Sequence, residues 1–159
     1  MTIKNFLKQF KTSTNRKKTC EARIKETYVP YAMKLVTCKN IIFSSSYRII
    51  KDSEGNKTGE EFMVNTPAKI MLFSMELIRL YTDVEVDLAN ITECFDELER
   101  EDAVVELLGA IPEREFNRFK SLLEMVYDDV YENSRSLAGY FDHNSRALFS
   151  LLEGLVPKE

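Results

Sequence analysis

The sequence predicts a mainly α-helical protein, a single-domain helical bundle with one β-hairpin and a basic N-terminal extension. Over most of the 159 residues, apolar side chains recur every three or four positions, which is the period of an amphipathic helix. One segment, at about residues 47–64, departs from this period and places β-prone residues on both sides of a turn. The first residues of the chain concentrate lysine and arginine.

The composition is that of one globular domain. The chain is 44% apolar and 30% charged, which allows a packed core and argues against disorder. Its three cysteines form no CxxC pair and have no nearby histidine, so neither a zinc site nor a disulfide framework is expected, and a reducing compartment fits best. No apolar run approaches the roughly 20 residues that a transmembrane helix needs, and we expect no contact with a membrane.

The N-terminal residues 1–25 are interpreted as a basic arm that contains a short helix. Ile3, Phe6, Leu7 and Phe10 share one helical face. The polar stretch 12–18 that follows has no apolar residue to bury, which is typical of a linker. Residues 26–159 are then the helical domain. The basic residues expected to contact a partner are Lys4, Lys8, Lys11, Arg16, Lys17 and Lys18.

The middle of the chain predicts a helix, a hairpin and a second helix. Pro30 is suited to the first turn of a helix that continues to about Phe43. Residues 47–50 and 61–64 flank a turn rich in Asp, Gly and Asn at 52–59, the pattern of a hairpin. The same turn explains the sequence Gly55-Asn56-Lys57-Thr58, which lacks the first glycine of a phosphate-binding loop because position 50 is isoleucine.

Asn65-Thr66-Pro67 is a strong helix start, with a capping side chain followed by proline. The helix that it opens, residues 66–81, is apolar on nearly every side. Such a helix lies in the centre of the core or is covered by a partner, and we expect the first.

The second half of the chain predicts four more helices. Short ones are expected at 88–98 and at 104–111. Pro112 opens the longest amphipathic helix, which Gly139 ends, and leucines at 148–155 predict a terminal helix.

Charge divides the chain almost end to end. Residues 1–57 hold 13 Lys and Arg against 4 Asp and Glu, whereas residues 58–159 hold 9 against 22. A basic surface on one copy can bind an acidic surface on another. The basic arm can also contact an acidic partner or the phosphates of nucleic acid without reading sequence.

Candidate catalytic chemistry is sparse. Asp128, Asp129 and Glu132 are close enough on one helix to hold Mg²⁺ or Mn²⁺, yet no lysine or histidine is placed as a catalytic partner. His143 is the only histidine and cannot build a zinc site alone. We therefore predict no catalytic residue, no cofactor and no metal, and assign the three carboxylates to an acidic interaction surface.

Four short strings resemble uncharacterised proteins of tailed bacteriophages that infect low-GC Gram-positive hosts. The strings are Tyr28-Val29-Pro30-Tyr31, Val64-Asn65-Thr66-Pro67-Ala68-Lys69, Leu80-Tyr81-Thr82-Asp83 and Glu124-Met125-Val126-Tyr127-Asp128-Asp129. The resemblance covers about residues 26–141 and leaves out the basic residues 1–25. It implies a product of the structural and morphogenesis genes, without catalytic residues.

The resulting expectation is a non-enzymatic phage structural or assembly protein of the head–tail or tail region, which contacts copies of itself or other phage structural proteins. It would reside in the host cytoplasm during assembly and then in the virion. Two alternatives stay open at this point. One is a phage-encoded inhibitor that binds a host or defence protein through an acidic surface, and the other is a metal-dependent enzyme that uses Asp128 and Glu132.

Overall fold

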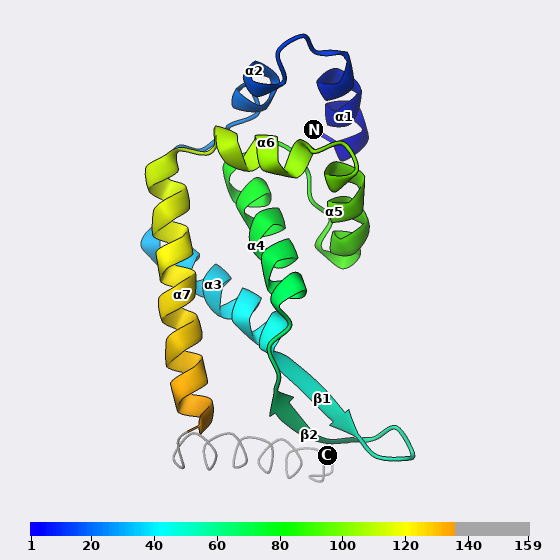
Figure 1. Cartoon of the computed structure of the whole chain (residues 1–159), viewed down its shortest axis with the longest axis vertical. Helices are drawn as coiled ribbons and strands as arrows, with labels where there is room; N and C mark the ends of the chain where they lie inside the picture. Colours follow the sequence, from blue (N-terminus) through cyan, green and yellow to red (C-terminus); the bar gives the residue numbers. More distant parts are fainter. Residues whose placement is uncertain (136–159) are drawn as a thin grey trace, which may run out of the picture.

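The computed structural model describes residues 1–135 of the chain and is mainly α-helical, with a small antiparallel sheet. A central helix, α4, runs through the body of the molecule, α7 runs along one side, and the hairpin projects from one end (Figure 1). The predicted helix at 148–155, the predicted helix end at Gly139 and His143 lie outside the described residues.

The N-terminal segment differs from the expected arm. Helix α1 (Ile3–Thr12) begins after Thr2, whose hydroxyl accepts a hydrogen bond from the Asn5 amide. Phe6 and Phe10 are fully buried, so this helix is part of the core. The stretch expected to be a linker contains a second helix, α2 (Arg16–Glu21), capped by Asn15 and anchored by the buried Cys20. Both helices carry their lysines on the exposed side.

Helix α3 (Tyr31–Ser46) follows Pro30 as predicted and leads into the hairpin. Strands β1 (Tyr47–Lys51) and β2 (Lys57–Phe62) pair antiparallel. The turn places Gly55 at a φ of +87°, a conformation that glycine adopts without strain. The hairpin expected at about 47–64 is therefore confirmed.

Helix α4 (Thr66–Tyr81) starts at the Asn65 cap, where the side-chain oxygen accepts from the Ala68 amide at 3.1 Å. After an extended segment come a 3₁₀ turn (Leu88–Asn90), α5 (Ile91–Glu99) and α6 (Ala103–Ala110). The longest helix, α7 (Glu113–Arg135), begins directly after Pro112.

Two clusters of buried apolar residues form the core, and α4 belongs to both. One cluster lies between α3, α4 and α7, where Leu77 and Tyr81 meet Phe119. The other joins α1, α2, α5 and α6 to the same helix through Met75 and Ile78. Helix α4 is thus the central core helix, because its two sides serve different clusters.

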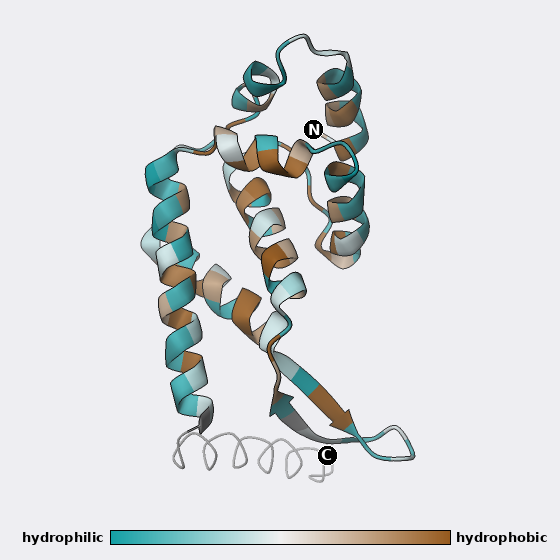
Figure 2. Ribbon diagram, viewed as in Figure 1, coloured by the Kyte–Doolittle hydropathy of each residue, from teal (hydrophilic) through white to brown (hydrophobic). Residues whose placement is uncertain are grey.

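The distribution of apolar residues along the helices agrees with this packing (Figure 2). Helices α1 and α7 alternate apolar and polar residues, and most of the apolar ones are buried or partly buried. In residues 1–135, no helix is long and apolar enough to cross a membrane.

Candidate interaction site

A buried ion pair ties together the elements that form the candidate site. Glu115, near the start of α7, and Lys34 of α3 are 4% exposed each, and their charged atoms are 2.6 Å apart. The same carboxylate oxygen, Oε2, accepts from the Tyr81 hydroxyl at the end of α4 at 2.8 Å and from the Val29 amide at 3.3 Å. One carboxylate therefore fixes the relative positions of α3, α4, α7 and the loop before α3.

The environment of Glu115 keeps it ionised. Burial alone raises the pKa of this carboxyl, but hydrogen bonds from Lys34, Tyr81 and the Val29 amide, together with the Lys34 charge, outweigh burial and hold the pKa below its usual value. Burial, followed by the hydrogen bond to Glu115, raises the pKa of the Tyr81 hydroxyl. The network thus holds α3 and α7 together around an ionised Glu115. Its member Lys34 also lines a cleft on the surface.

This cleft lies between the segment around the start of α3 and the first half of α7. Its volume is about 650 Å³, within the range of small-molecule and side-chain binding pockets. Tyr28 and Tyr31 are more than half exposed beside it. The cleft is lined by Tyr28, Tyr31, Lys34, Arg114, Asn117, Arg118, Ser121, Leu122 and Met125.

The cleft is basic because Glu115 compensates only part of its positive charge. Arg118 lies 3.6 Å from the second oxygen of Glu115, too far for a strong charge-assisted hydrogen bond. Arg114 is exposed and has no ion-pair partner within residues 1–135. Two guanidinium groups can therefore bind carboxylates from outside the molecule.

The second half of α7 carries the acidic residues that the sequence singled out. Asp128, Asp129 and Glu132 are all exposed, and none of them forms an ion pair in the described part of the chain. Asp128 and Glu132 share their side of the helix with Arg114 and Arg118, by the helical period. Residues 1–135 contain no group of three His, Cys, Asp or Glu side chains arranged to hold a metal ion.

The six predicted basic residues are divided between α1 and α2, and several have partners within the chain. Lys11 is 2.7 Å from Glu101, and Lys17 is 4.0 Å from Glu21. The Arg16 guanidinium lies over the Phe10 ring. A groove between α1 and α5 brings together Lys4, Leu7, Lys8, Lys11, Glu97, Arg100 and Glu101.

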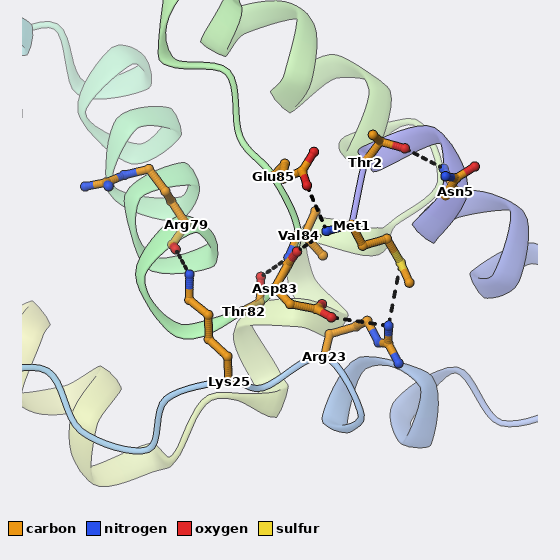
Figure 3. A network of polar contacts seen from close by, with 10 residues as sticks. All are labelled: Met1, Thr2, Asn5, Arg23, Lys25, Arg79, Thr82, Asp83, Val84 and Glu85. Carbon is orange, nitrogen blue, oxygen red and sulfur yellow. Dashed lines mark hydrogen bonds and ion pairs between the residues drawn. The ribbon is translucent and has the colours of Figure 1, made fainter.

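Part of the charge division in the sequence is therefore compensated inside one molecule. At the start of the chain, the Met1 ammonium is 3.3 Å from Glu85, and Arg23 is 3.4 Å from Asp83 (Figure 3). These contacts, like the Lys34–Glu115 pair, join a basic residue of the first 57 to an acidic residue of the remainder. The basic N-terminal part folds onto the acidic part of its own chain.

Sequence reasoning missed Lys34, Glu115 and the arginines of the cleft. Arg114 and Arg118 stand four residues apart, and with Asp128 and Glu132 they make one exposed side of α7 basic first and acidic last, although the first turn of the helix also holds two glutamates. This change of charge along one side of the helix is the sequence feature from which these arginines could have been identified.

The comparisons with known proteins give no match. No family model, no curated protein and no solved structure matches the chain.

Proposed function

We propose that this protein is non-enzymatic and acts through repeated protein–protein contacts, as a structural or assembly component of a tailed bacteriophage. The observation that carries the proposal is a set of exposed apolar side chains on α3 and the hairpin. A partner that covers them removes apolar surface from water, which is the main favourable contribution to most protein association.

These side chains belong to neither of the two core clusters. Met33, Val36 and Phe43 are about half exposed and share one side of α3. Strand β1 adds Ile49 and Ile50, which are 52% and 43% exposed and, as neighbours in a strand, point to opposite faces of the hairpin. A stretch of β1 is brown in Figure 2. We call these five residues the α3–β1 surface.

The setting of the proposal comes from the resemblance to phage proteins. On this basis the partners are other copies of the chain or other phage structural proteins, met in the host cytoplasm during assembly and retained in the virion. The cleft and the exposed charges of α7 support this proposal, because they offer contacts to such partners without a catalytic group.

Quantification of the protein in purified particles of the phage that carries its gene tests the proposal. We expect a fixed number of copies per particle. In a Val36→Glu/Phe43→Glu variant, charge on the α3–β1 surface should remove the protein from particles. Asn5→Glu/Gln9→Glu, which adds the same charge on the exposed side of α1, should leave it there. Absence of the wild-type protein from particles, with recovery bound to one host protein, would instead support the inhibitor alternative.

A further inference from the structure

We propose that two copies of this chain pair through α7, antiparallel and around a two-fold axis, so that the basic half of each helix lies on the acidic half of the other. The inference rests on the proposed function, because it takes a second copy as one of the protein partners. It names the surface and the register of that contact.

The first step is a continuous exposed stripe along α7. Its residues follow one another at intervals of four or three positions, which keeps them on one side of a helix. All are exposed, and they face away from buried residues such as Phe119 and Val126. The α7 stripe consists of Arg114, Arg118, Ser121, Met125, Asp128 and Glu132.

The second step is the symmetry of this stripe about its middle. When two copies are placed antiparallel with the axis midway between Ser121 and Met125, Arg114 faces Glu132 of the other copy. In the same register Arg118 faces Asp128, and Ser121 faces Met125. Each contact occurs twice, so one register satisfies every member of the stripe, as an isologous interface requires.

The third step is the exclusion of the parallel arrangement. Parallel helices in register would place Arg114 on Arg114 and Glu132 on Glu132, and like charges across an interface are strongly unfavourable. Asp129, one helical position beside the stripe, adds negative charge to the half that meets the arginines.

The fourth step is the cleft beside the basic half. Ser121 lines it next to Leu122, so Met125 of the second copy, which is 62% exposed in the single chain, meets apolar lining there. Tyr28 and Tyr31 form the opposite wall. Apolar contact thus lies at the centre of the interface and ion pairs at both ends, an arrangement common in protein interfaces.

Sedimentation velocity of the full chain tests the pairing through charge reversal. Arg114→Glu/Arg118→Glu makes the stripe entirely acidic, and Asp128→Arg/Glu132→Arg makes it entirely basic. Each variant alone should dimerise about 100-fold or more weakly than wild type, because every stripe contact becomes repulsive. A 1:1 mixture should form a heterodimer, since all four charge contacts are then attractive.

The matched control is K17E/K18E, which changes net charge by as much as R114E/R118E but lies on α2; it should dimerise like wild type. A salt series should weaken the wild-type dimer as the Debye length shrinks to about 3 Å at 1 M. Heterodimer formation also shows that both variants are folded. A wild-type protein that is monomeric at every concentration, or dimers unaffected by both stripe variants, would overturn the inference.

Cross-linking tests the register directly. In a Cys94→Ser background, which removes the accessible native thiol, Arg114→Cys mixed with Glu132→Cys should give a disulfide-linked pair. Arg114→Cys alone should give none, because the two copies of that position lie about 27 Å apart along paired helices. Cross-linking of Arg114→Cys with itself would instead indicate parallel pairing.

The same measurements separate this inference from the proposed function. A stripe variant that no longer dimerises but still enters particles leaves the proposed function standing and assigns particle binding to another surface. Intact pairing of a protein that is absent from particles contradicts the proposed function alone.

Discussion

At the scale of single residues, Glu115 connects α7 to α3, to the end of α4 and to the loop before α3. It receives Lys34, Tyr81 and the Val29 amide on one oxygen while it is nearly inaccessible to solvent. Removing one member of a buried ion pair leaves the other charge uncompensated, which is costlier than replacing both. The cleft and the first half of the α7 stripe depend on this support.

We expect Glu115→Gln to lower the free energy of unfolding by about 3–5 kcal/mol at pH 7, because the buried Lys34 side chain loses its counter-charge. Chemical denaturation measures the loss. Glu124→Gln, on the exposed side of the same helix, is the control and should change stability by less than about 0.5 kcal/mol. The double variant Lys34→Met/Glu115→Leu should be more stable than Glu115→Gln. A single variant as stable as wild type would show that the pair contributes nothing.

The same residue predicts a pH dependence. The pKa of Glu115 is lower in the folded than in the unfolded chain, so its contribution is fully present above the unfolded value of about 4.3 and is lost as pH falls through the folded value. Denaturation at several pH values should show the gap between wild type and Glu115→Gln narrowing below about pH 4. A gap that is constant with pH would contradict this assignment.

The cysteines should differ in reactivity. Burial raises the pKa of the Cys38 thiol to about 12, and burial followed by nearby glutamates does the same for Cys20. Because the thiolate is the form that reacts, the two buried cysteines should react slowly. Cys94 is partly accessible to a reagent. A thiol reagent should label one cysteine in the folded protein and three after denaturation, and Cys94→Ser should abolish the native signal. Rapid labelling of Cys38 in the native state would refute the packing around it.

At the scale of elements, the sequence pattern of α1 predicts the helix itself, but not that the helix packs into the core. Its apolar face, with Phe6 and Phe10, was evident from spacing. The residues that this face packs against cannot be found from the local sequence, because they are distant in the chain and include Ile78 and Leu98. The lysines on the other face made the segment resemble a free arm, although exposed lysines are equally compatible with a docked amphipathic helix.

We expect Phe6→Ala to lower the free energy of unfolding by about 3–5 kcal/mol, since it leaves a cavity in a fully buried site. Deletion of residues 1–18 should be more damaging still. Denaturation curves of these variants, with Lys4→Ala/Lys8→Ala as the exposed control on the same helix, measure the effects. A truncated protein that melts like wild type would restore the interpretation of residues 1–25 as an arm.

Elements that local signals define were predictable, and contacts between distant residues were not. The capping side chain of Asn65 and the restricted backbones of Pro30 and Pro112 mark helix starts. The Asp, Gly and Asn residues of the hairpin turn likewise predict that turn locally. Helix α2 was missed because Cys20 is its only buried residue. The acidic residues of the candidate site were identified, but the cleft was not, because it requires Lys34 and Glu115 to meet across 81 positions of the chain.

At the scale of the whole molecule, the folded chain brings its opposite charges together. The basic first part and the acidic remainder suggested separate surfaces, yet Lys11, Arg23 and Lys34 each meet an acidic partner in the second part. The sequence position of a charge therefore says little about which face of the molecule presents it. On the exposed surface the separation survives along α7, where both signs occur on a single helix.

The two core clusters should unfold as one cooperative unit, because α4 contributes to both. Phe6→Ala perturbs one cluster and Leu123→Ala the other. Each substitution should move a single thermal transition downward, by roughly 10 °C for a loss of about 3–4 kcal/mol in a chain of this size. Calorimetry measures this, and the calorimetric enthalpy should equal the van't Hoff enthalpy. If Phe6→Ala instead splits the melt into two transitions, with only the earlier one shifted, the clusters are independent and α4 does not couple them.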